Sequence, residues 1–279
     1  MNGIDIIDIK EKNIKGAYVI DGFPSVGLVG SIVANYLVSF LNLEQIAVVD
    51  SIYFPSISLV REGVPLSPVR VYGGSLGTKG QEKVVVFVSE FQPAQDILKP
   101  LAITMMDWVE DHKCKMVISP EGLLSKDDSE RIEALAKASS EKLAEYGAAI
   151  SDDAIEPGAG VRVWGVGSTP SVRQIMKQID VKTFENGVIA GFAGVLLNEG
   201  VARDFDVLTL LAEAHAEYPD ARAAAAIMTV IDRMLLHVEL DLKPLLEEAA
   251  LIEDTLKEIQ KKAINEEESS KRKTSYMYG

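Results

Sequence analysis

The chain has few of the residues on which disulfide-bonded and zinc-binding proteins depend. Its 279 residues include one cysteine, Cys114, which excludes an internal disulfide and is interpreted as a small buried apolar residue. The three histidines, His112, His215 and His237, are scattered and do not have the spacing of a zinc site. We therefore expect neither a bound metal nor a cofactor.

Basic side chains and long apolar runs are also scarce. Lys and Arg number 28 against 42 Asp and Glu, and the resulting formal charge of -14 argues against nucleic acid as a partner, because phosphate binding needs a basic face. No apolar run reaches the roughly 18 residues of a membrane-spanning helix. The first residues also lack the basic-then-apolar pattern of a signal peptide. We expect a cytoplasmic protein without a membrane partner.

The chain does contain a regular alternation of short apolar runs and amphipathic segments. Runs rich in Val and Ile predict strands over 17–21, 46–50, 57–60, 69–72, 84–89, 116–119, 161–166 and 188–191. Amphipathic segments predict helices over 28–41, 93–112, 128–146 and 171–179. This order predicts an α/β fold with a mixed, mainly parallel sheet and helices on both faces. The antiparallel part is expected at 69–89, where a glycine-rich turn joins two strands in a hairpin.

After Arg203 the pattern predicts helices only, over 205–216, 219–237 and 243–264. The predicted domains are accordingly an α/β domain over 1–203, a helical subdomain packed on it over 204–264, and a flexible tail over 265–279. The last helix carries a broad apolar stripe. Such a stripe packs equally well on the chain's own core, which we favour, or on a second copy.

Two features at predicted strand ends suit a ligand site as well as ordinary structure. Gly22, Gly27 and Gly30 lie between a strand and a helix, where backbone amides can hold an anion. Their spacing is not that of a dinucleotide or phosphate loop, so a tight turn with close helix packing is the favoured interpretation. Glu121 follows a strand at a position typical of α/β ligand sites, although an ordinary polar loop residue explains it too. No catalytic constellation is recognisable.

The last three residues, Met277, Tyr278 and Gly279, have the form of a docking peptide: a hydrophobic residue, Tyr, and any residue with the free carboxylate. The preceding stretch over 261–276 contains one large aliphatic residue, Ile264, and cannot bury enough apolar surface to order itself. A mobile tail of this length spans an r.m.s. distance of roughly 20 Å. The aromatic ring and the carboxylate suit a pocket with a basic group on a partner.

Four segments together resemble the proteasome assembly chaperone family in its archaeal branch. They are GFPSVGLVGSIVANYL over 22–37, FPSISLVREGVPLSPVRVYGG over 54–74, GFAGVLLNEGVARDFDVLTLLAEA over 191–214, and YPDARAAAAIMTVIDRMLLHVELDLKPLLEEA over 218–249. The resemblance covers roughly residues 15 to 250. It implies a fold similar to purine nucleoside phosphorylases, no catalytic activity, a homo-oligomer, and work on the proteasome core particle.

The resemblance also implies a partner for the tail. In such proteins a terminal hydrophobic-Tyr-any peptide, the HbYX motif, inserts between adjacent α-subunits of the proteasome, where a lysine meets its carboxylate. Met277, Tyr278 and Gly279 occupy those three positions here. The sequence therefore predicts an assembly chaperone, adaptor or activator. The alternative is a nucleoside- or nucleotide-binding protein or enzyme that uses the same sheet, which a thermal-shift screen with those ligands distinguishes.

Overall fold

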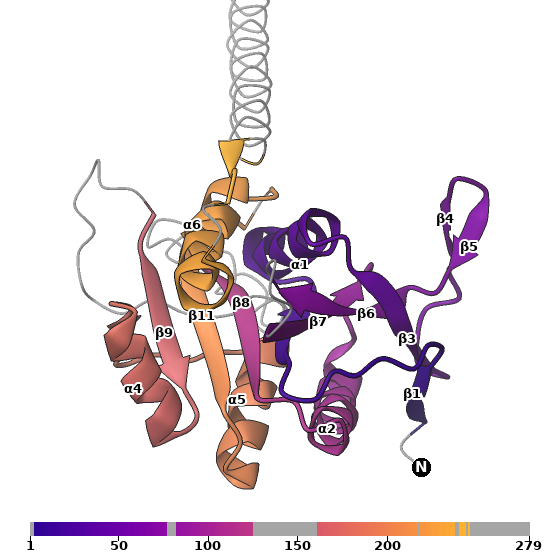
Figure 1. Ribbon diagram of the computed structural model, residues 1–279, viewed down its shortest axis with the longest axis horizontal. Helices are drawn as coiled ribbons and strands as arrows, with labels where there is room; N and C mark the ends of the chain where they lie inside the picture. The colour runs from indigo at the N-terminus through magenta and orange to yellow at the C-terminus, as the bar shows by residue number, and fades with distance from the viewer. Residues whose placement is uncertain are drawn as a thin grey trace, which may run out of the picture. The chain divides into compact units, whose positions relative to one another are not determined.

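The computed structural model describes residues 3–76, 82–124, 161–216, 218–237, 240–243 and 245 of the chain (Figure 1). Contacts divide the chain into two units after Leu240, and every helix and strand described below belongs to the first unit.

The body is built on a nine-stranded sheet with the order β1-β3-β6-β7-β2-β8-β11-β9-β10. Its strands are β1 (Ile4–Asp8), β2 (Tyr18–Gly22), β3 (Glu44–Ser51), β6 (Val69–Leu76), β7 (Glu82–Ser89), β8 (Met116–Leu124), β9 (Val163–Gly167), β10 (Lys182–Thr183) and β11 (Val207–Ala214). A separate two-stranded hairpin consists of β4 (Leu59–Arg61) and β5 (Val64–Leu66).

The predicted mixed sheet is confirmed, but the expectation that it is mainly parallel is wrong. The central strands β7, β2, β8 and β11 are parallel neighbours, as are β9 and β10. The other four neighbouring pairs are antiparallel, and they include the predicted β6–β7 hairpin. Antiparallel neighbours need no crossover helix, and β6 and β7 are joined directly, whereas β2 and α1 lie between β1 and β3 in the chain, and the β4–β5 hairpin lies between β3 and β6.

Helices lie on both faces of the sheet, as predicted. They are η1 (Val26–Leu28), α1 (Val29–Phe40), α2 (Gln95–Asp111), α4 (Pro170–Gln178), α5 (Gly191–Arg203), α6 (Ala221–Ile231) and the short π-helical η3 (Asp232–Leu236). The helices α1 and α6 contact each other on one face, where α1 packs on β2, β7 and β8. On the other face α2 contacts α5 (Figure 1).

The core forms because the central strands are apolar on both faces. All nine residues of β8 are buried, as expected for a strand covered by helices on both sides. On one side, α2 places Leu101, Met105 and Trp108 in a single buried row of helical spacing, and the Trp108 ring meets Phe87 of β7 edge to face.

Two predicted elements are wrong and three strands were not expected. The predicted helix over 205–216 is wrong: Val207–Ala214 form β11, because the run Leu208–Leu211 is buried on both faces between β8 and β9. The sheet therefore continues past Arg203. Residues 188–191 are not a strand, since α5 begins at Gly191. The edge strands β1 and β10 and the short β5 were missed.

Two predicted helices are outside the described part of the chain. These are the helix over 128–146 and all but the first few residues of the one over 243–264.

Candidate functional site

Met277, Tyr278 and Gly279 lie outside the described residues, so their docking role stays a prediction. The other predicted site residues are described, and they lie around the carboxyl end of β2. The expectation that Glu121 follows a strand is wrong, as is the loop alternative, because β8 continues to Leu124 and buries this side chain. This edge also carries further polar groups.

A buried polar row crosses this edge of the sheet. The Ser119 hydroxyl donates a 2.7 Å hydrogen bond to Asp21, whose other carboxylate oxygen accepts one of 3.0 Å from the amide of Phe23. Thr209 is the β11 neighbour of Ser119, and its buried hydroxyl has no hydrogen-bond partner among the described residues. Glu121 lies two residues beyond Ser119 on the same face of β8. The row therefore places two carboxyl groups in a nearly dry environment, with Asp21 3% and Glu121 8% exposed.

Burial changes the proton affinity of both carboxyl groups. It raises the pKa of Asp21 from 3.8 to about 6, although the hydrogen bonds from Ser119 and the Phe23 amide act in the opposite direction. The pKa of Glu121 is raised well above its usual value by burial and, secondarily, by the Asp21 charge. The pair is thus suited to retain a proton near neutral pH. A phosphate group is repelled here as soon as either carboxyl ionises.

The glycine loop reaches the same edge but packs on the opposite face. Gly27 has a φ of 60° and its carbonyl accepts a 2.8 Å hydrogen bond from Asp220, the N-cap of α6. The amides of Leu28 and Gly30 donate to the carbonyl and the hydroxyl of Ser25. These two amides therefore already donate hydrogen bonds to groups of the protein itself. The loop geometry therefore favours a tight turn over an anion cradle.

Gly22 and Gly30 fit the same interpretation. A Cβ at Gly22 would overlap the Ala34 side chain and the Phe87 carbonyl, and one at Gly30 would lie 3.0 Å from the Pro120 carbonyl oxygen. The glycines thus let α1 and the loop approach the sheet closely. The structure brings Gly22, Gly27, Gly30 and Glu121 to one edge without forming a single cavity wall from them.

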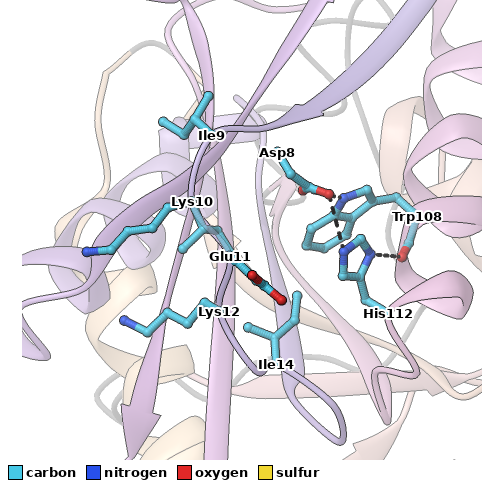
Figure 2. Close-up of a pocket in the computed structure, with 9 residues that line it drawn as sticks. Asp8, Ile9, Lys10, Glu11, Lys12, Ile14, Trp108 and His112 are labelled. Carbon is cyan, nitrogen blue, oxygen red and sulfur yellow. Dashed lines mark hydrogen bonds and ion pairs between the residues drawn. The ribbon is translucent and has the colours of Figure 1, made fainter.

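A second site, which no sequence pattern indicated, is a pocket of about 490 Å³ between the segment that follows β1 and the end of α2 (Figure 2). Asp8 accepts a 3.1 Å hydrogen bond from the indole of Trp108 and lies 3.5 Å from Nε2 of His112. The Trp108 and His112 rings are in contact, with centroids 4.1 Å apart and their planes tilted by 32°. Asp8 and His112 are 104 positions apart in the sequence and are brought together because β1 joins the sheet beside β3 and α2 packs against it.

Replacing Trp108 with phenylalanine is expected to lower the free energy of unfolding by about 2 kcal/mol. Phenylalanine fills most of the buried volume, but it leaves Asp8 without its indole donor and shortens the contact with Phe87. Urea unfolding followed by circular dichroism measures the loss. A change below about 0.5 kcal/mol would show that the wall of this pocket contributes little to stability.

Among the described residues, no three His, Cys, Asp or Glu side chains come together in a way that could hold a metal ion. Cys114 is buried, as expected. Nor does any helix in the described ranges have the length and apolar composition to cross a bilayer.

Comparisons with known proteins agree with this fold. The model of the PAC2 family matches residues 19–260. An uncharacterised protein of Methanocaldococcus jannaschii is 25% identical over 241 residues, which are 86% of this chain and 84% of that protein.

Among solved structures, PbaA of Pyrococcus furiosus, an archaeal homologue of proteasome-assembly chaperones, is similar to this chain. It has 26% identity and a TM-score of 0.69, and the match covers 92% of this chain and 96% of PbaA. PbaB of the same organism, an archaeal proteasome activator, shares the fold with a TM-score of 0.73 at 21% identity, covering 93% of this chain and all of PbaB.

Proposed function

The chain belongs to the PAC2 family, and from this premise we propose that it is a proteasome assembly chaperone or a proteasome-binding adaptor or activator. The observation that carries the proposal is the similarity to PbaA over nearly the whole length of both chains. The similarity to PbaB extends the proposal to activation, since the two share one fold. We place this activity in the cytoplasm and assign it no catalytic step.

The tail supplies the contact with the proteasome in this proposal. Met277 offers an adaptable apolar side chain, Tyr278 a rigid ring with a hydroxyl group, and Gly279 the terminal carboxylate. These three groups suit a pocket between adjacent α-subunits that contains a lysine. One such contact is weak. A homo-oligomer that presents several tails to a ring of repeated pockets binds more tightly, because each bound tail raises the effective concentration of the others.

A pull-down with recombinant archaeal α-subunit rings tests this proposal. The unchanged chain is expected to be retained, and a chain ending at Tyr276 is expected to lose at least about 100-fold in apparent affinity, since avidity multiplies the loss of each tail contact. Tyr278→Ala should behave like the truncation. Tyr276→Ala is the matched control. It removes a tyrosine ring two positions before Tyr278, outside the docking motif, and should bind normally. Equal retention of the full-length and truncated chains would refute docking by the tail.

A further inference from the structure

The β4–β5 hairpin is an unusually apolar projection from the body, and we call residues 52–66 the arm. Five large apolar side chains are exposed along it: Ile52, Tyr53, Ile57, Val60 and Val64. Ile52 is 83% exposed. An isolated two-stranded hairpin is only marginally stable in water, and contiguous exposed apolar surface marks an interaction site. Figure 1 shows the arm beside β3, on the side of the sheet where α1 lies.

The sheet face next to the arm is also uncovered, and we call it the open face. Ile4 and Ile6 of β1 point toward the core under α2, so the alternation of the strand turns Asp5 and Ile7 to the opposite face. Helix α1 packs over β2, β7 and β8 on that face, and Ile7 remains 48% exposed. Half-buried Val48, its neighbour on β3, extends the apolar part.

The charges of the open face are arranged unfavourably within one copy. Asp5 and Asp50 are direct cross-strand neighbours on this face, and both are exposed. Like charges at such positions destabilise a sheet. Neither carboxylate forms an ion pair with another residue in the part of the chain that the structure describes.

The arm has the complementary composition. Its charged residues are Arg61 and Glu62, which sum to zero on a chain of formal charge -14. The Arg61 side chain is 56% exposed and makes a 3.6 Å ion pair with Glu90 of its own copy, which leaves it accessible to further carboxylates. An apolar hairpin with an accessible guanidinium group fits an apolar sheet face that ends in two aspartates.

We propose that the arm of one copy lies on the open face of a second copy, in a two-fold contact in which both arms are used. The arm and the open face adjoin on one molecule, as a self-complementary surface requires. Arg70, the neighbour of Val48 on this face, is fully buried and paired with Glu90 of its own copy. A second copy is favoured over another partner because Asp5 and Asp50 have no ion-pair partner among the described residues, and the arm provides both an accessible guanidinium group and apolar side chains. This interface rests on the homo-oligomer of the proposed function and identifies the residues that hold it.

The oligomeric mass tests this interface. By light scattering coupled to size exclusion, the unchanged chain should have a multiple of the 30.3 kDa mass of a single chain. The double variant Val60→Asp with Val64→Asp should dissociate, with a dissociation constant raised on the order of 100-fold, because it places four carboxylates in one contact. The matched control is Val188→Asp with Val201→Asp, which changes two equally exposed valines elsewhere and should keep the oligomer.

A charge exchange tests whether the partner surface is the open face. Arg61→Glu should weaken the oligomer, and combining it with Asp50→Lys should restore the mass, since the pair is re-formed with reversed sign. An oligomer that withstands both arm variants would overturn the inference and leave the tail-docking proposal standing. A chain that is monomeric throughout would also overturn it. So would an arm variant that keeps its oligomeric mass but loses proteasome binding, since the arm would then contact the proteasome.

Discussion

Replacing Gly122 with alanine is expected to lower the free energy of unfolding by about 3 kcal/mol. Gly122 lies in β8 against η1, and a Cβ there would overlap the carbonyl oxygen of Val26 and lie 2.8 Å from its carbonyl carbon. Backbone atoms cannot rotate away as the end of a side chain can. The glycine loop must therefore shift as a whole, and the close packing of α1 on the sheet is lost with it.

Gly165→Ala is the matched control for this substitution. Gly165 is also a strand glycine, in β9, but the nearest atom to a Cβ there is the terminal methyl of Met176, at 2.9 Å. A methionine side chain adapts at little cost, so a loss of no more than about 1 kcal/mol is expected. Urea unfolding of the two variants measures both values. Equal losses would mean that the approach of the loop to β8 is not what requires a glycine at position 122.

The second large effect is a pH dependence caused by the buried carboxyl pair. The pKa of Asp21 is raised from 3.8 to about 6 by burial, so between these pH values the folded state holds a proton that the unfolded state has released. The unfolding free energy therefore falls as the pH rises through this window. A shift of this size corresponds to about 3 kcal/mol. Glu121, whose pKa is also raised, acts in the same direction.

Comparison with Asp21→Asn isolates this effect. The amide does not titrate, so the unchanged chain should lose about 3 kcal/mol relative to the variant as the pH rises from 4 to 7, whatever the constant cost of the substitution. Denaturant unfolding at a series of pH values measures the difference. A constant difference over that range would show that Asp21 is not in a desolvated site.

Glu44→Gln provides a control of opposite sign. Hydrogen bonds from Lys10 and Lys12 lower the pKa of the exposed Glu44 carboxyl to about 2. The folded protein therefore loses the stabilisation provided by the ionised Glu44 carboxylate only as the pH falls from about 4.5 through about 2. The difference in unfolding free energy between Glu44→Gln and the unchanged chain should shrink on acidification. The corresponding difference for Asp21→Asn should change at higher pH.

Hydrophobic patterning predicted the central strands and the helices α1, α2 and α4. Buried residues form short continuous runs in these strands and recur at helical spacing in these helices. The patterning failed for β11, whose run LTLLAEA is compatible with a helix, and for α5, where glycines and valines conceal the helical pattern. The edge strand β1 was missed because one of its faces is largely exposed. The secondary structure of these segments depends on the elements that pack beside them. The hydrophobic pattern of a single segment contains no information about those neighbours.

The candidate sites divide in the same way. The sequence by itself predicted the buried strand at 116–119, which the structure extends past Glu121 to Leu124, and the glycine loop that joins a strand to a helix. Tertiary structure alone placed Asp21 and Ser119 beside Glu121, joined Asp8 to Trp108 and His112, and left the arm next to the open face of β1 and β3. Spacing along the chain fixes which side chains share a face of one element. Which faces meet depends on strand order, and that is set by packing between segments far apart in the sequence.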